Sequence, residues 1–393
     1  MSLLDRSGLS RRDVLAIAAQ LGVGSTAAAL WPADLSAQAL PGKHAMLTAL
    51  STRPPDYETP VALLDSLITP VDRFYVRCHM PVPATTAEAG WSLAIDGEVA
   101  APVSLTVAEL KQLPQTSVTV TLECAGNGRA YFDPPVAGIQ WRKGAVGTAK
   151  WTGVRVADVL ERAGAKAGAT HIWVSGADRP LGSQPPFVRQ VPMAKASHPD
   201  TLIAWAMNDQ PIPAVHGAPL RLIVPGWEGA YAIKWLNKLT VATKEFDGFW
   251  VATGYRYPTK RVAPGAAVDA KDTAPLTGLA VKSLITTPLD GAVVKPGRVT
   301  IAGFAWAGET DITKVDVSTD SGATWQPARL TGQAVKYAWR RFEFAFDATR
   351  QETHTILSRA TDAMGQTQPI VPQWNPSGYL WNAPDQIRIE VTA

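Results

Sequence analysis

Residues 118–129 read VTVTLECAGNGR. Apolar residues at 118, 120 and 122 alternate with polar ones, which is the pattern of a β-strand with one buried face. The alternation stops at Cys124, and the glycines and asparagine that follow permit a tight turn. The segment therefore places a cysteine at the end of a strand, with Arg129 five residues further along the chain.

A cysteine in this position has two interpretations. A nearby guanidinium stabilises a thiolate over a thiol, and a thiolate is a soft ligand for metals. Free cysteine is also among the most buried residue types, so Cys124 would otherwise be a small apolar residue at a strand end. The spacing alone leaves both interpretations open.

The composition is that of a globular protein of ordinary polarity. The 393 residues are enough for two domains, and 46% of them are hydrophobic and 18% charged. A net charge of +3 is small, and no basic run with interleaved aromatic residues occurs. Nucleic acid is therefore not an expected partner.

Cysteine usage limits the kinds of metal site. The chain has only Cys78 and Cys124, with no CxxC or CxxCH motif. Zinc ribbons, iron–sulfur clusters and c-type haem are therefore not expected. In an oxidising compartment the two cysteines could form a disulfide, which would exclude a metal thiolate.

Residues 1–39 have the pattern of an export signal. Arg11 and Arg12 precede a mildly apolar stretch over residues 16–30, and Ala37-Gln38-Ala39 offers a cleavage site. Paired arginines favour the twin-arginine route to the periplasm, which carries folded proteins and suits a chain that must receive a cofactor first. The apolar stretch is too short and polar for a stable membrane anchor. The alternative is an amphipathic N-terminal helix.

A second motif, HGAPLRLIVPG, covers residues 216–226. His216 and Arg221 frame the start of an apolar strand, and Lys234 follows beyond a turn. Cationic and donor groups that converge on one point can hold a phosphate. The alternative is a core histidine with solvated Arg221 and Lys234.

The remaining pattern predicts an α+β fold with a β-rich end. We expect a hairpin around Asp96-Gly97, a helix over residues 155–163 and a buried strand over residues 171–177. Residues 258–280 read as a linker. Short alternating runs separated by turns over residues 281–391 are typical of a β-sandwich.

TLECAGNGR resembles the molybdenum-ligand segment of the sulfite oxidase family, and further segments match in order along nearly all of the chain after residue 40. The resemblance implies a mixed α/β molybdopterin-binding domain over residues 40–272 and an immunoglobulin-like dimerisation domain over residues 273–393. A homodimer is therefore expected. It also implies one molybdenum-molybdopterin per chain, with Cys124 as the protein ligand of the metal, and no haem.

The same resemblance assigns roles to single residues. The segment FYVRCHMPVP (residues 74–83) is similar to the family segment that runs under the pterin and sends an arginine to the substrate. Trp141 matches a wall of the pocket, and Tyr255 the active-site tyrosine. The implied catalytic residues are Arg77, Arg129, Trp141 and Tyr255. The implied cofactor-binding residues are Tyr75, Arg77, Cys78, His79, Asp178, His216, Arg221 and Lys234.

Two positions depart from the family pattern. Many members carry a third substrate arginine where this chain has Ser377, and often an asparagine where it has Cys78. We hypothesise that Arg142 or Lys143 restores the missing charge. We also expect Cys78 to be a free thiol, because a disulfide to Cys124 would remove the metal ligand.

The family resemblance implies oxidation of sulfite to sulfate, with electrons passed to an external acceptor, most simply a cytochrome c. One alternative is the reverse chemistry, the reduction of S- or N-oxides. A second alternative is a non-enzymatic periplasmic binding module built on the β-sandwich. That module would leave Cys124, Arg129, His216 and Arg221 without a function.

Overall fold

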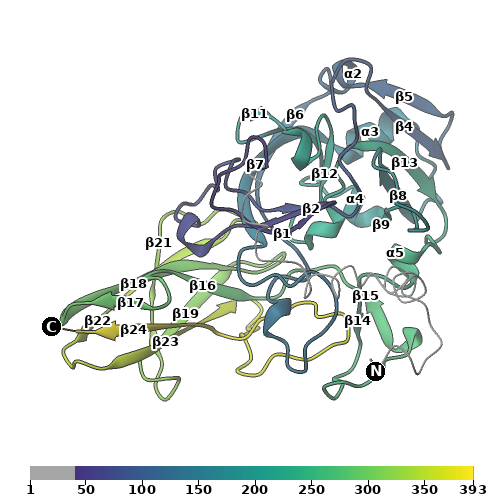
Figure 1. The fold of residues 1–393 in the computed structure, drawn as a ribbon. Helices are drawn as coiled ribbons and strands as arrows, with labels where there is room; N and C mark the ends of the chain where they lie inside the picture. Colours follow the sequence, from purple (N-terminus) through teal and green to yellow (C-terminus); the bar gives the residue numbers. More distant parts are fainter. Residues whose placement is uncertain (1–39, 393) are drawn as a thin grey trace, which may run out of the picture.

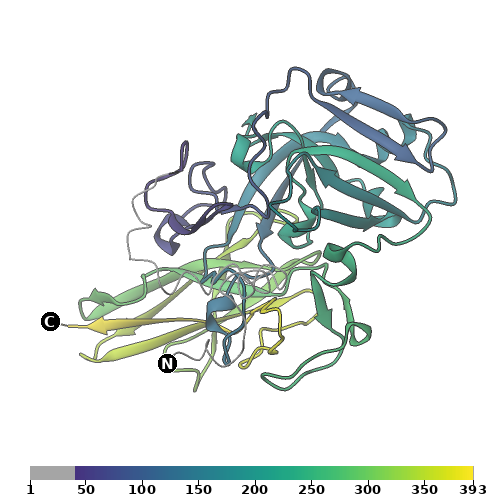
Figure 2. The same ribbon diagram turned by 45° about the vertical axis from the view of Figure 1, so that its right-hand side comes forward.

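The structure is a computed structural model that describes residues 40–392. Figure 1 shows two units, an N-terminal unit with strands β1–β13 and a C-terminal sandwich with strands β16–β24. In Figure 2 the chain again passes from the first unit to the second through a separate two-stranded ribbon. This ribbon pairs β14 (Arg256–Pro258) with β15 (Thr273–Pro275), so it overlaps the predicted linker over residues 258–280 and begins two residues before it.

Three sheets form the N-terminal unit. The first is β1 (Thr48–Thr52), β2 (Pro55–Glu58) and β3 (Val76–Arg77). The second contains β6 (Gln115–Glu123), β7 (Val146–Arg155), β10 (Leu202–Met207), β11 (Gln210–Pro211) and β12 (Arg221–Ile223). The third runs in the order β5 (Val103–Thr106), β4 (Ser92–Gly97), β13 (Leu236–Ala242), β8 (His171–Gly176) and β9 (Val188–Pro192).

The described helices that precede the sandwich are short. The α-helices are α2 (Val107–Leu110), α3 (Val156–Arg162), α4 (Met193–Ala196) and α5 (Phe249–Ala252). The 3₁₀ turns are η4 (Val61–Leu63), η5 (Arg129–Tyr131), η6 (Ala214–His216), η7 (Gly229–Tyr231) and η8 (Ala270–Asp272). The predicted helix over residues 155–163 is confirmed as α3, and the predicted hairpin as the antiparallel pair β4–β5.

The sheet that contains β6 and β7 has apolar residues on both faces, and this fixes the end of β6. One face packs with α3 and the β4–β13 sheet around residues such as Val154, Ile203 and Leu239. The other face packs around Phe74, Leu122 and Trp151. The apolar residues of β6, such as Leu122, all lie on this second face. A shift of one residue in register would move them to the opposite face, so the position of Cys124 just after β6 is well determined.

Two packed sheets make the C-terminal sandwich. One runs in the order β16 (Lys282–Thr287), β18 (Gly297–Trp306), β22 (Arg340–Ala348) and β21 (Arg329–Thr331). The other runs β17 (Ala292–Val294), β24 (Asp385–Val391), β23 (Thr353–Asp362), β19 (Ile312–Ser318) and β20 (Gln326–Pro327). The alternating runs thus form the expected sandwich, and the α+β fold class is confirmed.

Buried polar contacts join the two units behind β6. Lys282 of the sandwich donates from Nζ to Glu123 Oε1 (2.5 Å) and to the carbonyl of Asn127 (3.0 Å). Trp306 donates from Nε1 to Glu123 Oε2 (2.9 Å). Glu123 is only 2% exposed, so the residue before Cys124 is held by the sandwich from inside the protein.

Within residues 40–392, no helix has the length and apolar character needed to cross a membrane. The predicted export signal over residues 1–39 lies outside the described residues.

Candidate active site

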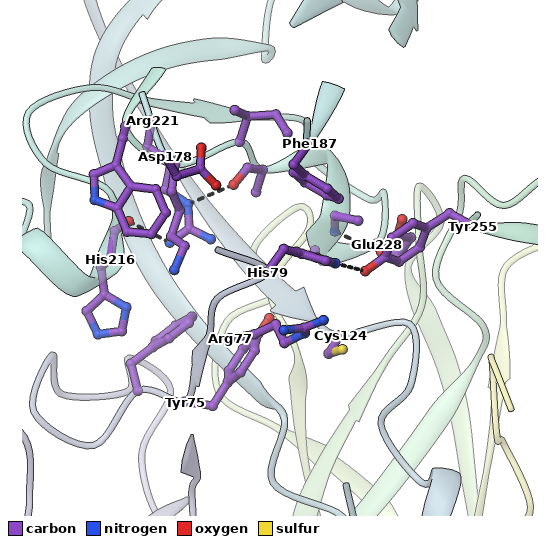
Figure 3. A pocket seen from close by; sticks show the side chains of 17 residues that line it. Tyr75, Arg77, His79, Cys124, Asp178, Phe187, His216, Arg221, Glu228 and Tyr255 are labelled. Carbon is purple, nitrogen blue, oxygen red and sulfur yellow. Dashed lines mark hydrogen bonds between the residues drawn. The ribbon is translucent and has the colours of Figure 1, made fainter. Parts of the chain in front are cut away.

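One pocket of the N-terminal unit collects side chains from distant parts of the chain (Figure 3). It encloses about 660 Å³ of atom-free space, including the part that opens to solvent. Its walls come from segment 74–79, the end of β6, the loop after β8, residues 216–235 and the turn before β14. Most residues predicted for the site line this pocket: Tyr75, Arg77, His79, Cys124, Asp178, His216, Arg221, Lys234 and Tyr255.

The other predicted residues are Cys78, Arg129 and Trp141, of which Cys78 and Trp141 contact residues of the pocket lining. The sulfur of Cys78 is 2.8 Å from Nζ of Lys234. Trp141 is fully buried and meets the ring of Tyr75 edge to face, at 6.3 Å between centroids. The guanidinium of Arg129 donates to the carbonyls of Ile139 and Ser377. None of the three is part of the pocket lining.

The turn after β6 is fixed by hydrogen bonds on both sides of Cys124. The Cys124 N–H donates to Ala145 (2.9 Å), and its carbonyl accepts from Asn127 N–H (2.8 Å). The Asn127 side chain donates to Glu123 Oε1 (2.9 Å) and accepts from Ala145 N–H (3.1 Å). Gly128 has φ +94°, and a Cβ there would lie 2.6 Å from Trp381, so the turn requires glycine at this position.

Opposing effects act on the Cys124 thiol. Burial raises its pKa, while the positive charges of Arg77 and Arg129 and the Gly126 N–H lower it. A buried thiol beside two guanidinium groups is a better metal ligand than a buried thiol alone. In residues 40–392 no cluster of three or more His, Cys, Asp or Glu side chains is placed to hold a metal ion.

A buried carboxylate holds Arg77 in place. Asp56 on β2 accepts from Arg77 Nη1 (3.2 Å) and from the Cys78 N–H (3.1 Å). Strands β2 and β3 pair Asp56 directly with Arg77, so the sheet register sets this contact. The pairing orients the guanidinium toward the pocket and offsets part of its charge.

A histidine and a tyrosine meet across the pocket. His79 Nε2 lies 2.5 Å from the hydroxyl of Tyr255, and Figure 3 shows the two side chains pointing toward each other. The His79 ring stacks on Phe187 at 3.9 Å and meets Trp250 edge to face. Burial lowers the pKa of His79 well below 6.5, with Arg77 and other cations adding to the effect. Burial raises the pKa of Tyr255 well above 10, so both groups are neutral at neutral pH.

The opposite end of the pocket is rich in buried cationic groups. Arg221 donates to the carbonyl of Ala232 through Nε (3.2 Å) and to that of His216 through Nη1 (3.0 Å). Burial lowers the pKa of His216 well below 6.5, lowers that of Lys234, and lowers that of Arg221 to about 10. This is the group that the HGAPLR motif predicted, and the structure brings its members together.

Lys234 also interacts with the two groups whose roles were least defined by the sequence, with Asp178 through its charge and with Cys78 through a hydrogen bond. Burial raises the pKa of Asp178 to about 6, and Lys234 opposes that rise. The Cys78 sulfur lies beside Lys234 Nζ, and neither Cys78 nor Cys124 forms a disulfide, as expected.

Sequence reasoning missed three residues of the site. Phe187 and Glu228 line the pocket, and Arg189 lies behind Tyr255, with its guanidinium carbon 4.9 Å from the ring centre. Glu228 Oε1 has no hydrogen-bond partner among the described residues, and its closest cation is Arg189 Nη2 at 3.9 Å. The one available signal was a glutamate inside the apolar run LIVPGWEGAYAI (residues 222–233).

The proposed substitutes for the missing third arginine are not in the pocket. Lys143 pairs with buried Asp385 at 2.6 Å, and Arg142 is exposed. Both line a different hollow between the two units. The structure therefore does not support the hypothesis that Arg142 or Lys143 compensates for Ser377. Ser377 itself offers its carbonyl to Arg129 (3.2 Å).

Comparison with known proteins gives a consistent result. Residues 79–250 match the oxidoreductase molybdopterin binding domain, and residues 274–392 the Mo-co oxidoreductase dimerisation domain. The chain is 36% identical to sulfite oxidase of Gallus gallus over 87% of this chain and 78% of the relative. It is 32% identical to sulfite oxidase of Arabidopsis thaliana over 86% of this chain and 93% of the relative. The crystal structure of the sulfane dehydrogenase SoxCD from Paracoccus pantotrophus is similar with a TM-score of 0.75 and 28% identity, over 92% of this chain and 95% of that chain.

Proposed function

Because the chain belongs to the sulfite oxidase family of molybdopterin oxidoreductases, we propose that it oxidises sulfite to sulfate in the pocket around Cys124. The observation that carries this proposal is the meeting of Cys124, Arg77 and Tyr255 in one pocket whose far end is lined by cations. The cofactor of the family is molybdenum-molybdopterin. When bound, it accepts electrons and supplies the oxygen-transfer chemistry that side chains lack.

The donors and acceptors of the pocket fit this cofactor. His216, Arg221 and Lys234 are buried positive or donor groups whose pKa values are all lowered by burial, so an anion bound among them would favour their charged forms. They would hold a phosphate. Glu228 Oε1 is a buried acceptor without a partner among the described residues, and N–H groups of a pterin are donors that would satisfy it.

The close packing around Gly229 is a further sign of fit. A Cβ at Gly229 would lie 3.0 Å from the Tyr75 hydroxyl and 3.0 Å from the Glu123 carbonyl. A side chain at this position would therefore crowd the wall of the pocket next to Tyr75. Cys124 would supply the protein thiolate to the metal.

The protein groups near Cys124 suit an anionic substrate. Arg77 stays charged, and the N–H groups not used by Asp56 and Cys78 can bind substrate oxygens. Tyr255 keeps its proton, because burial raises its pKa, and can donate a hydrogen bond. Phe187, Trp250 and Tyr379 pack around His79 and Tyr255 and exclude water from them.

A second candidate substrate is a sulfane sulfur group. Arg77 is partly neutralised by Asp56, and the position of the third arginine is taken by Ser377, so the pocket has less positive charge for a dianion. The similar SoxCD structure is that of a sulfane dehydrogenase. The reduction of S- or N-oxides, which reverses the direction of oxygen transfer, remains an alternative. Membership of this enzyme family excludes the non-enzymatic binding module.

Export by the twin-arginine route and electron transfer to a periplasmic cytochrome c belong to the same proposal. The sequence of residues 1–39 supports export, and the dimerisation-domain match supports a homodimer through the sandwich. Mass spectrometry of protein recovered from the periplasm should find a chain that begins near residue 40. An N-terminus at residue 1 in the cytoplasm would contradict export.

The deciding experiment measures molybdenum content and sulfite-dependent reduction of cytochrome c, for wild type, Cys124→Ala and Cys78→Ala. We expect about one molybdenum per wild-type chain and loss of activity in Cys124→Ala. The Cys78→Ala variant is the control, because it also loses one thiol but should retain activity. Assays with an alkyl persulfide and with methionine sulfoxide separate the other substrates. Molybdenum without sulfite oxidation, but with persulfide oxidation, would favour the second candidate. Absence of molybdenum would refute the proposal.

A further inference from the structure

A lysine outside the recognised motifs contacts His216, which lines the cationic end of the pocket, although the lysine itself is not part of the lining. Lys43 Nζ lies 2.9 Å from His216 Nε2 and donates to the carbonyl of Val71. Lys43 belongs to the segment over residues 40–47, more than 170 positions away from His216 in the chain. We propose that Lys43 is a fourth cationic residue of the phosphate site and that this segment closes the phosphate end of the cofactor. The inference rests on the proposed function.

The segment is anchored where Lys43 needs it. The N–H of His44 donates to the carbonyl of Asp72 (2.9 Å), and the N–H of Lys43 donates to that of Leu40 (2.9 Å). Leu40 and Leu47 pack in the apolar cluster that contains Trp235, which lines the pocket, and Val215, which precedes His216. The segment is therefore packed against the outer wall of the phosphate site.

The contact with Lys43 also defines the hydrogen bonding of His216. An ammonium group has only donors, so His216 Nε2 must accept from it when Lys43 is charged. The ring proton then lies on Nδ1, which makes that nitrogen a donor. Lys43 would thus help to fix the tautomer of His216, whose ring also forms a hydrogen bond with the Val71 carbonyl.

The charged groups of this region favour the binding of an anion. Burial lowers the pKa of Lys43 to about 7, and only Asp72 opposes this effect appreciably. His216, Arg221 and Lys234 are also shifted toward their neutral forms by burial. Lys43 and Lys234, which burial destabilises as cations, would be stabilised in their charged forms by a bound anion, whereas Arg221, with a pKa of about 10, is already charged at neutral pH.

The test measures how fast the purified enzyme loses its cofactor. Wild type, Lys43→Ala and Lys43→Arg are incubated in high salt, and molybdenum and released pterin are followed with time. We expect Lys43→Ala to lose both about tenfold faster than wild type, the effect of removing one hydrogen bond to a charged group. Lys43→Arg keeps the charge and should recover most of the retention. Lys150→Ala, which removes an exposed lysine paired with Asp209, serves as the matched control and should behave as wild type.

Each outcome bears on the inference. Equal melting temperatures of the cofactor-free wild-type and Lys43→Ala proteins, together with faster loss, would support it. Equal rates of loss would overturn it and leave the proposed function intact. A melting temperature lowered in the cofactor-free Lys43→Ala protein, with no rescue by arginine, would show a structural role and also overturn it. Wild-type protein without molybdenum or pterin would refute the proposed function and this inference with it.

Discussion

At the residue scale, Glu228 is a buried carboxyl of the pocket whose Oε1 has no hydrogen-bond partner among the described residues. Burial raises its pKa from 4.5 to about 7, and Arg189 and the Ala230 N–H only partly oppose the rise. The folded protein therefore binds this proton more tightly than the unfolded chain does. The stability contributed by protonated Glu228 is complete below pH about 4.5 and is lost as the pH rises through 7.

The Glu228→Gln variant should remove that pH dependence, because an amide keeps the shape and does not ionise. Relative to wild type, the cofactor-free variant should gain stability between pH 5 and pH 8. Urea midpoints at several pH values measure the difference, with Glu88→Gln as an exposed control. Parallel pH profiles for wild type and Glu228→Gln would contradict the assignment.

Arg142 gives a second prediction at this scale. Its guanidinium is exposed and lies outside the pocket, so Arg142→Ala should leave the KM for the oxidised substrate within about twofold, as for most surface substitutions. Arg77→Ala in the same assay provides the contrast, because Arg77 lines the pocket. A large rise in KM for Arg142→Ala would revive the compensation hypothesis.

The positions of single residues could be predicted where neighbours in sequence are neighbours in space. Cys124 with Arg129, and His216 with Arg221, are close in the chain, and their roles as metal ligand and anion site stay predictions. Lys43, Arg189 and Glu228 were missed because their partners come from other segments, and only the folded chain creates those contacts.

At the element scale, the turn η6 (Ala214–His216) positions the phosphate end. It ends at Gly217, which has φ +109°, and a Cβ there would lie 2.8 Å from Cβ and 2.9 Å from Cα of Lys234. The Gly217 carbonyl also accepts from the Trp235 N–H (3.1 Å). Any side chain at residue 217 would strain the turn and displace Lys234.

Gly217→Ala should therefore lower the free energy of unfolding by about 1–3 kcal/mol and reduce the molybdenum content of the purified protein. Chemical denaturation and metal analysis measure the two effects. Gly168→Ala is the matched control, since a Cβ there meets no atom within 4 Å. An unchanged unfolding free energy for Gly217→Ala would show that the turn adapts without cost.

Element boundaries were predicted well where periodicity is strong. Helix α3 and strand β8 match the predicted ranges closely, because their apolar residues repeat at helical and strand spacing. Strand β3 has only two residues, Val76 and Arg77, and it is held by its antiparallel pairing with β2, which comes from a different segment. The parallel pairing of β4 with β13 joins strands about 140 residues apart, and no local pattern indicates it.

At the scale of the whole molecule, the contact between the units supports the site. The ion pair between Lys282 and Glu123 is buried, with side-chain exposures of 9% and 3%. Lys282→Met would leave Glu123 without its cation, although Trp306 and Asn127 still bind the carboxylate. Removal of one partner of a buried pair costs about 3–5 kcal/mol.

We therefore expect Lys282→Met to destabilise the protein by about that amount and to lower its molybdenum content. Adding Glu123→Gln should recover part of the stability, because no unpaired charge remains. Arg329→Met, which breaks an exposed ion pair of the sandwich, should cost less than about 1 kcal/mol. Equal effects of Lys282→Met and Arg329→Met would refute a special role for the buried pair.

The two-part organisation itself could be predicted, because sandwich strands alternate regularly and the linker is polar. The boundaries at residues 40, 272 and 273 stay predictions. How the units meet could not be foreseen: a charged lysine at the start of β16 gives no local sign that it is buried against a glutamate 159 residues earlier.

The contact between the two units limits how such enzymes can diverge. In the C-terminal part of the chain, the Leu380 N–H donates to the carbonyl of Ala125 (2.9 Å), and the Tyr379 ring stacks on that of Tyr255. This part therefore contacts both sides of the candidate active site. The two halves therefore do not behave as interchangeable modules. Consider a chimera that joins this N-terminal unit to the sandwich of a distant relative. It would contain all the residues that line the pocket, but the turn that carries Cys124 would be misplaced. Recombination between relatives should succeed only where residues 123, 282 and 306 are exchanged together.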